Sequence, residues 1–387
     1  MIFDHTIRFT GDGTLADPSH AREDLAAHAM RIGHRRMLDG DSLLVELERV
    51  RLTGRGGGHF PVASKLRPVM SSGADAVVVN GSEGETLSSK DAALLQLRPH
   101  LVLDGAQALA RAVRARRVVV WLHRGADASV ESIVRACEER ERDARHRGDV
   151  PVQVMLGPAR YLTGEASAVI AGVRGEPVLP RFIENPARPW VDGEPVLVHN
   201  TETAARVGLL DAEGIEYEPT SLVTLSLHTH RFVVEVDPDV TFAQLFRDHG
   251  VNVPEHVLLG GFGGEWAPWS ALADTNVDPH RMRERGLAFG TGIISLVPAG
   301  RTGLEWSAEM LEWMAGESAG QCGPCIFGLP ELAKWYSALA RGRRRNEGRR
   351  REIEHLMGLV ERRGACRHPD GAVRMARSAL VAFGGAR

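Results

Sequence analysis

The sequence predicts a mixed α/β protein built from an α/β layer, a small β-rich domain and a helical bundle. Between residues 54 and 200, short apolar strands alternate with helical stretches, which is the pattern of a sheet covered by helices. From about 220 to 300 short strands follow one another, and beyond Leu304 only helical periodicity occurs. A chain of 387 residues is long enough for two or three such domains. We expect segments at 1–50, 51–219, 220–302 and 303–387.

The first segment predicts an irregular lead and two helices that run into a glycine-rich loop. The second helix begins after an N-cap sequence at 39–42 and carries Leu43, Leu44, Leu47 and Val50 at helical spacing. The α/β layer follows, with strands at 77–79, 118–122 and 152–155 and helices over 94–114 and 128–147. The β-rich domain has strands at 222–227, 232–236 and 293–297, with a helix over 242–248.

Composition excludes several classes of protein. The net charge of −3 gives no electrostatic reason to expect nucleic acid binding. No apolar run approaches the roughly 18 residues that a membrane-spanning helix needs, so we expect no direct membrane insertion. The first residues lack the basic start and apolar run of a secretory signal. With only four cysteines, three of them clustered, a reduced cytoplasmic setting fits better than a disulfide framework.

Three cysteines have the pattern of a soft metal site. Cys322 and Cys325 form a C-x-x-C pair, and Cys366 follows about forty residues later, which suits an iron–sulfur cluster or zinc. A four-iron cluster normally takes four cysteines, and the slot three residues before Cys322 holds Ala319. Ser318 is adjacent, but one step along a helix would turn its side chain by roughly 100°. An iron–sulfur cluster, zinc and no metal all remain open, and Cys137 is best explained as core filler.

A glycine cluster at 54–61 precedes a helical stretch that contains Lys65. Glycines let backbone N–H groups close on a phosphate, and Arg55 or Lys65 could add positive charge. This loop is not the G-x-G-x-x-G fingerprint, and a plain structural turn is the alternative.

Three further loops place polar residues after predicted strands or before predicted helices. Residues 79–85 carry Asn80, Glu83 and Glu85 at the carboxyl end of a strand, where open α/β sheets bind ligands. The loop at 161–168 sets Glu165 at a helix start, where an acid is more often a cap than a binding residue. The segment 198–203, which contains Asn200, is equally ambiguous between a site and a solvated turn.

Taken in order, these segments resemble the flavin- and nucleotide-binding subunit of respiratory complex I and its relatives in soluble hydrogenases and formate dehydrogenases. The resemblance runs from about residue 43 to the C-terminus. It rests on the G-R-G-G-x-G-F-P loop at 54–61, the N-x-D-E-x-E and K-D pattern at 80–91, and the G-E-E turn at 164–166. The V-N-N-x-E-T pattern at 198–203 and the cluster cysteines complete it.

The resemblance implies a Rossmann-like FMN-binding domain, a β-grasp domain of the soluble-ligand-binding type and a helical iron–sulfur domain. Phe60 and Glu85 would lie on the side where the nicotinamide ring of NAD(P)H stacks for hydride transfer, with no catalytic acid or base. The cluster would have three ligands, Cys322, Cys325 and Cys366, in a four-iron or three-iron form. The residues matched to the flavin site are Gly54, Arg55, Gly56, Gly57, Lys65, Asn80, Glu83, Gly164, Glu165 and Asn200.

Departures from the family pattern gather on the nucleotide side. Ala166 replaces the second acid of the G-E-E turn, Ser82 replaces an acid, and His199 replaces the first Asn of the N-N pair. Phe182 lies near the position of a family aromatic but does not align onto it, and Asn185 falls in the same proline-rich stretch. Loss of an acid near a ribose favours weakened NADH binding or tolerance of NADPH.

The leading hypothesis is an FMN-dependent electron-transfer subunit that works between NAD(P)H and a ferredoxin-like or other iron–sulfur partner. One alternative is an FMN carrier that exchanges electrons with ferredoxin without a nucleotide, which Ala166 and Asn185 favour. Another is a scaffold or ligand-binding subunit without redox centres, which Ala319 favours. The arginine run at 341–351 is expected to be a solvated loop or a landing patch for an acidic partner. His228 and His230 are expected on the surface of a strand.

Overall fold

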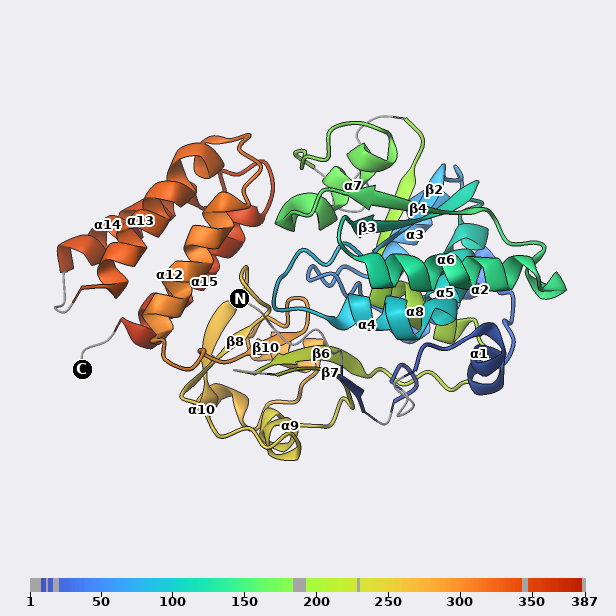
Figure 1. Cartoon of the computed structure of the whole chain (residues 1–387), viewed down its shortest axis with the longest axis horizontal. Helices are drawn as coiled ribbons and strands as arrows, with labels where there is room; N and C mark the ends of the chain where they lie inside the picture. Colours follow the sequence, from blue (N-terminus) through green and yellow to red (C-terminus); the bar gives the residue numbers. More distant parts are fainter. Residues whose placement is uncertain are drawn as a thin grey trace.

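The computed structural model describes residues 8–11, 13–16, 21–183, 193–227, 230–342 and 347–384. Figure 1 shows the α/β layer, a second sheet next to it and a bundle of C-terminal helices on the far side. The model confirms the predicted order of an α/β layer, a β-rich unit and a helical region. Asn185, His228 and the 343–346 part of the arginine run lie outside the described residues.

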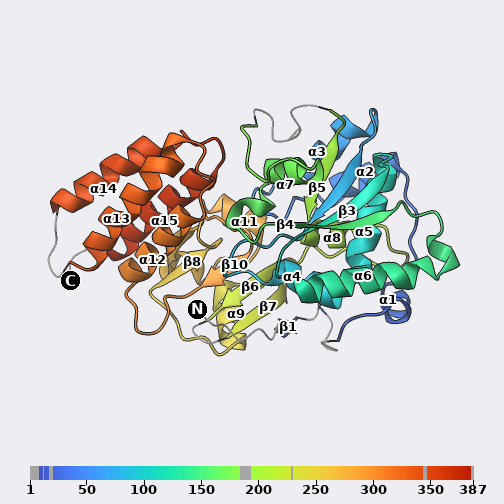
Figure 2. The ribbon, with the colours of Figure 1, turned by 45° about the horizontal axis from the view of Figure 1, so that its top comes forward.

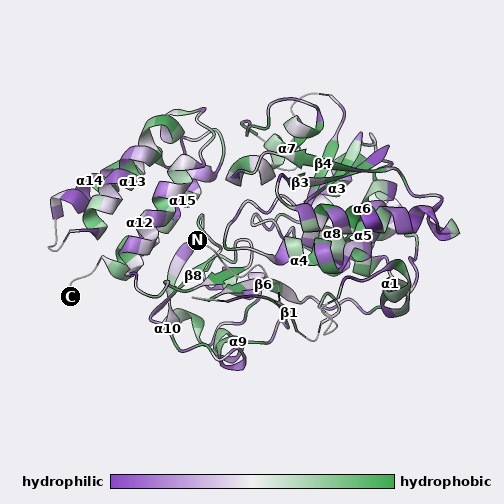
Figure 3. Ribbon diagram, in the orientation of Figure 1, coloured by the Kyte–Doolittle hydropathy of each residue, from purple (hydrophilic) through white to green (hydrophobic). Residues whose placement is uncertain are grey.

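A four-stranded parallel sheet forms the centre of the α/β layer, with the strand order β4-β3-β2-β5. Its central strands are runs of valine and leucine whose side chains are buried on both faces, as expected of a parallel sheet covered by helices. Figure 3 shows these strands as largely hydrophobic. The strands are β2 (Ala76–Asn80), β3 (Arg117–His123), β4 (Val152–Gly157) and β5 (Val196–Asn200).

Helices cover both faces of this sheet. On one face Val77 and Val79 share a core with the helices that precede and connect the strands. On the other, Val78 and Trp121 pack against α7. The helices are α1 (Leu25–Ile32), α2 (Gly40–Arg49), α3 (Val62–Met70), α4 (Lys90–Leu97), α5 (Pro99–Ala112), α6 (Asp127–Glu141), α7 (Ala166–Val173) and α8 (Thr201–Leu210). Short 3₁₀ turns lie at η1 (Ala144–His146) and η2 (Tyr161–Gly164).

Two predicted helices differ in extent from the observed ones. The helix expected over 94–114 is two helices, because Arg98 leaves the helical region at φ −127°, ψ 46° and Pro99 begins α5. A residue before proline is sterically pushed away from the α conformation. The helix expected over 128–147 ends at Glu141 and is followed by the 3₁₀ turn η1.

The second sheet has six strands in the order β1-β7-β6-β10-β8-β9. The beginning of the chain supplies β1, which pairs in parallel with β7, a contact that the sequence did not predict. His230 lies between β6 and β7 and is not part of a strand. The elements are β1 (Arg8–Thr10), β6 (Ser221–Ser226), β7 (Arg231–Val236), α9 (Phe242–Asp248), β8 (His256–Leu259), β9 (Glu265–Pro268), α10 (Trp269–Leu272), α11 (Pro279–Glu284) and β10 (Ile293–Ser295).

The C-terminal region is helical, and Figure 2 shows its long helices packed side by side. Residues 347–351 of the arginine run belong to α14, so this part of the run is not a loop. Ser318 and Ala319 lie in an irregular connection after α12, so the expected rotation along a helix does not apply to them. The elements are α12 (Gly303–Gly316), the π-helix η3 (Pro324–Gly328), α13 (Leu329–Ala340), α14 (Glu347–Val360) and α15 (His368–Phe383).

Across the described residues, no helix combines the length and the apolar character needed to cross a membrane.

Candidate functional site

Asn80 and Asn200 lie opposite each other at the carboxyl end of the parallel sheet. They are register partners on the neighbouring strands β2 and β5. Asn80 Nδ2 donates a hydrogen bond of 2.7 Å to the carbonyl of Gly164, which ties the first loop to the turn before α7. Asn200 is the N-cap of α8, and its Oδ1 accepts from the backbone N–H of Glu202 at 3.0 Å. The edge of the sheet thus brings three of the predicted loops together.

Glu83 and Glu165 both act as helix caps. Glu83 accepts from the backbone N–H groups of Asp91 and Ala92, at 3.2 and 3.0 Å, at the start of α4. Glu165 accepts from the N–H groups of Ser167 and Ala168, at 2.9 and 3.1 Å, at the start of α7. These carboxylates satisfy N–H groups that a helix terminus otherwise leaves unpaired. They fix the loop backbones around the edge of the sheet.

The glycine loop lies directly over this edge. The N–H of Arg55 donates to Thr203 Oγ1 on α8 at 2.9 Å, and a Cβ on Gly56 would lie 3.4 Å from the Cβ of Asn200. Gly57 has a φ of +93°, a conformation that other residues rarely adopt. The loop is also braced by the second sheet, because His59 Nε2 donates to the carbonyl of Gly290 at 2.9 Å.

A cavity with a volume of about 360 Å³ opens between these loops, within the range of cofactor sites. The α/β layer forms one wall, the second sheet contributes Gly260, Gly263 and Thr291, and α15 contributes His368 and Arg374. Eight of the twelve predicted cofactor residues line it: Gly56, Gly57, Asn80, Glu83, Glu85, Gly164, Glu165 and Asn200.

The four predicted residues that do not line the cavity are Gly54, Arg55, Phe60 and Lys65. Gly54 and Phe60 close the glycine loop on itself through a backbone hydrogen bond of 2.8 Å. Burial lowers the pKa of Lys65, and its charge contributes to the depressed pKa of His199, which is about 3 mainly because the ring is buried. Lys65 therefore lies on the side of β5 where His199 points.

A buried group of charges lies behind the glycine loop. Lys90 Nζ is 2.8 Å from Asp91 Oδ1 and 3.3 Å from Glu202 Oε2, and Glu202 also pairs with Arg206 at 2.9 Å. Arg55 Nε lies 3.8 Å from Glu202. Three cations thus surround two carboxylates, so the group is positive when all five are ionised.

Arg55 has donors without partners. Its side chain is 5% exposed, and its Nε and Nη1 are buried without a hydrogen bond. Burial lowers the pKa of Arg55, and the charge of Arg206 adds to this effect. An unpaired buried donor costs free energy unless an acceptor satisfies it. The positive charge and the open donors suit an anion such as a phosphate.

Glu85 joins the α/β layer to the second sheet. Its Oε2 accepts from the backbone N–H of Phe262 at 2.8 Å, and a Cβ on Gly261 would lie 2.5 Å from that oxygen. Burial raises the pKa of Glu85 to about 7. The glycine-rich segment at 260–264 therefore belongs to the site, although sequence reasoning did not assign it there. The run of glycines in this segment is the sequence signal from which it could have been assigned to the site.

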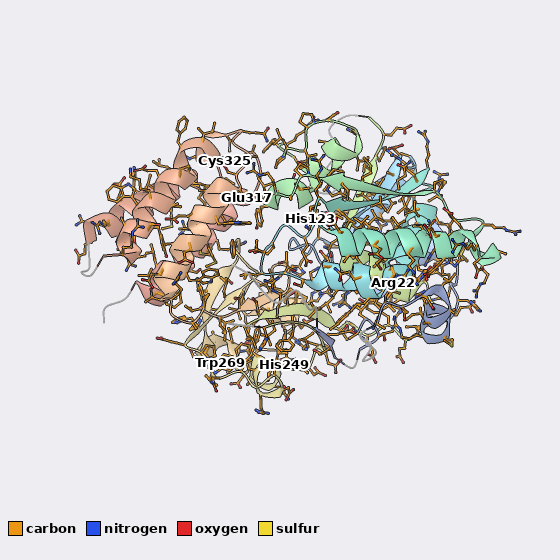
Figure 4. The ribbon with its side chains drawn as sticks, viewed as in Figure 1. Arg22, His123, His249, Trp269, Glu317 and Cys325 are labelled. Atoms are coloured by element: carbon orange, nitrogen blue, oxygen red, sulfur yellow. The ribbon has the colours of Figure 1, made fainter. Side chains whose placement is uncertain are left out.

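The three clustered cysteines lie at the end of the helical bundle that faces the cavity. Figure 4 places Cys325 and Glu317 at this end. Burial raises the pKa of the Cys325 thiol, and the neighbouring Cys322 adds to this effect. Cys366 lines the cavity, and burial raises the pKa of its thiol as well. Within the described part of the chain, no group of three His, Cys, Asp or Glu side chains is placed to hold a single metal ion.

Tyr161 connects the loops at the carboxyl end of the parallel sheet to the cysteine end of the bundle. Its N–H donates to Glu317 Oε2 at 2.8 Å, and its ring contacts Trp313 and His368 with centroid distances of 5.3 and 5.4 Å. Tyr161 and Met314 also line the cavity. Sequence reasoning missed these residues because they come together only in the tertiary structure.

Two other sequence features lie away from the site. Cys137 packs against the core of the α/β layer, and burial raises the pKa of its thiol to about 11. The arginine run begins after α13, whose 12 residues start close to the cysteine pair and span about 18 Å. The start of the run, residues 341–342, therefore lies at the opposite end of α13 from the cysteines.

Comparisons with known proteins agree with this geometry. The family model described as the Nuo51 FMN-binding domain matches residues 47–209. The model described as the NADH-ubiquinone oxidoreductase-F iron-sulfur binding region matches residues 305–386. The two models together match well over half of the chain. The chain is similar to the NADH-quinone oxidoreductase-F family in both of these regions.

Members of this family are similar to the chain over most of their length. The NADH-quinone oxidoreductase-F protein of Rhodobacter capsulatus is 26% identical over 93% of this chain and 89% of its own. Its counterpart in Escherichia coli K12 is 27% identical over 91% of this chain and 85% of its own. The NAD⁺-reducing [NiFe]-hydrogenase in its H₂-reduced state has the same fold, with a TM-score of 0.75 and 21% identity. The match covers 94% of this chain and 65% of that hydrogenase chain.

Proposed function

We propose that the chain transfers electrons between NADH and an iron–sulfur partner through FMN, as the flavin subunit of an oxidoreductase complex. The observation that carries this proposal is the single cavity that touches both the flavin-side loops and Cys366. Relatives named as NADH-quinone oxidoreductase subunits support both the nucleotide and the complex.

FMN fits the α/β side of the cavity. Lys90 of the positive group behind the glycine loop lines the cavity and supplies a charge for the phosphate of FMN, and the open donors of Arg55 lie behind it. A Cβ on Gly164 would lie 2.6 Å from the carbonyl of Ser82. The backbone segments of these two loops therefore lie too close together for any residue larger than glycine at position 164. FMN, when bound, accepts two electrons as hydride and releases them one at a time.

The chain's own residues position and shield this chemistry. Glu83 and Glu165 hold two helix starts at the cavity wall, and Asn80 locks the turn at Gly164. Glu85 and the 260–264 segment close one side against solvent. In the proposed reaction a nucleotide would lie against the bound cofactor without a protein acid or base, so orientation would supply the rate.

The test is an anaerobic absorption spectrum of protein reconstituted with FMN, iron and sulfide, before and after addition of NADH. We expect the flavin band to bleach within the time of a slow enzyme turnover, of order 0.1 to 1 s. A yellow protein that NADH leaves unbleached contradicts the proposal and supports exchange with ferredoxin alone. NADPH in a parallel sample shows whether Ala166 has widened the nucleotide choice.

Riboflavin is the matched control for the phosphate. It has the same ring system as FMN but has no phosphate that could contact the positive group behind the glycine loop. Loss of a charge-assisted contact of about 1.5–3 kcal/mol predicts that riboflavin binds at least tenfold more weakly than FMN. Equal affinities, measured by quenching of flavin fluorescence, would show that the loop does not hold a phosphate.

A further inference from the structure

Ala319 leaves the cysteine site one ligand short, and two polar side chains near it, those of Gln321 and Glu317, already have protein partners. The connection from α12 to Cys322 is irregular, and Gly320 adopts a φ of +64°. Gln321 Nε2 donates to the carbonyl of Pro180 at 2.9 Å. Glu317 accepts from the N–H of Tyr161 and lies 3.5 Å from Arg160. Both side chains are thus held by contacts within the protein.

His368 is the exception. Its ring is 5% exposed, and its Nε2 donates to the carbonyl of Met314 at 2.9 Å. Because Nε2 carries the proton, Nδ1 carries the lone pair, and this atom is buried without any hydrogen-bond partner. Metal-ligating histidines commonly donate their second ring N–H to a backbone carbonyl in this way, which fixes both tautomer and ring orientation.

His368 lines the same cavity as Cys366, which lies two residues earlier in the chain. Met314, which fixes the ring, is in the last turn of α12, five residues before Ala319. The ring also packs against Tyr161. The ring that carries the orphaned nitrogen is therefore fixed by Met314 and Tyr161 in the cavity that Cys366 also lines.

We propose that His368 Nδ1 is the fourth protein ligand of an iron–sulfur cluster held by Cys322, Cys325 and Cys366. The inference rests on the proposed function, which includes a cluster at this site. Ligation uses the lone pair of a neutral imidazole and displaces a water from iron, while the proton stays on Nε2. Imidazole in place of a thiolate makes the cluster less negative by one charge, which raises its reduction potential.

Labelled wild-type protein gives the direct test. The protein is reconstituted with iron and sulfide, reduced with dithionite, and studied by pulsed electron paramagnetic resonance with natural and ¹⁵N-labelled histidine. We expect a nitrogen coupling to the reduced cluster that changes on labelling. A reduced cluster without this coupling, a three-iron signal in the oxidised wild type, or no cluster at all would each overturn the proposal.

Two variants and one control sharpen the result. His368→Ala should lose the nitrogen coupling and shift the oxidised protein to a three-iron signal. Ala319→Cys should lose the coupling and lower the reduction potential, because a thiolate then occupies the fourth position. His355→Ala on the exposed side of α14 should leave the spectrum unchanged. If neither His368→Ala nor Ala319→Cys alters the wild-type spectrum, histidine ligation is contradicted. If His368→Ala does not fold, the labelled wild-type protein still decides the question.

Bleaching of FMN by NADH in the same samples separates the two proposals. Bleaching without a histidine coupling leaves the proposed function standing and removes only the ligand assignment. A histidine coupling in protein whose FMN is not bleached by NADH supports the ligand assignment and contradicts the oxidation of NADH by the protein.

Discussion

Gly57 and Gly58 are neighbours in the glycine loop with very different surroundings. Gly57 has a φ of +93°, and its Cβ would lie 3.3 Å from Thr291, whereas nothing lies within 4 Å of a Cβ on Gly58. We expect Gly57→Ala to lose about 1–2 kcal/mol of stability from backbone strain and about tenfold in FMN affinity. Gly58→Ala should stay within about 0.5 kcal/mol. Urea unfolding and FMN titration of both variants provide the measurement, and equal behaviour would contradict the expectation.

Glu85 gives the residue-scale prediction of pH dependence. Its pKa is raised from 4.5 to about 7 in the folded protein, so between these values the folded state binds more protons than the unfolded state. Stability from this group is therefore present at low pH and falls as the pH rises through that window, by at most roughly 3 kcal/mol. Glu85→Gln keeps an acceptor for Phe262 but cannot ionise.

The measurement is the unfolding free energy of wild type and Glu85→Gln, without FMN, from pH 5 to 8. The difference between them should grow in favour of the variant as the pH rises. A difference that stays constant over this range shows that Glu85 titrates with an ordinary pKa.

At the scale of elements, α5 and α8 pack unusually closely through two glycines. A Cβ on Gly105 would lie 1.7 Å from the carbonyl of Ala204, and one on Gly208 would lie 2.5 Å from the carbonyl of Leu101. Gly105→Ala must push the helices apart, which costs about 1–3 kcal/mol or more. Because α8 begins after its N-cap Asn200 on the cavity wall, we also expect weaker FMN binding.

Gly358 in α14 is the matched control, because nothing lies within 4 Å of a Cβ there. Gly358→Ala should stabilise the protein by up to about 1 kcal/mol through helix propensity alone. The urea midpoints of the two variants should therefore move in opposite directions. A shift in the same direction would mean that the close packing of α5 and α8 is not rigid.

At the scale of the whole molecule, the cavity walls come from all three parts of the chain. FMN at one hundred times its dissociation constant should add about 2.7 kcal/mol to the unfolding free energy. We expect calorimetry to show a single unfolding transition whose midpoint temperature rises when FMN is bound. A helical bundle that melts at the same temperature with and without FMN would contradict a shared cavity.

The sequence predicted those parts of the molecule that local patterns determine. The valine strands of the central sheet, the Asp39 cap of α2 and helix α9 over 242–248 all follow from periodicity and capping, and the structure confirms them. The three-residue strand β1 was missed, because only its partner β7 makes it a strand. The role of Glu165 as the cap of α7 was predicted from its place at a helix start, and the structure confirms it. The capping of α4 by Glu83 and the approach of His368 to Tyr161 depend on tertiary contacts that no local pattern contains.

The cavity also sets an order of events during synthesis. Gly56 is made early, whereas His368, Gly371 and Arg374 belong to the last helix of the described chain. Chains emerge from the ribosome N-terminal end first and fold as they emerge. A nascent chain that has exposed only its α/β layer and second sheet therefore lacks the third wall. The cofactor can be enclosed only after α15 has been released, so enclosure of FMN follows synthesis of the helical part of the chain.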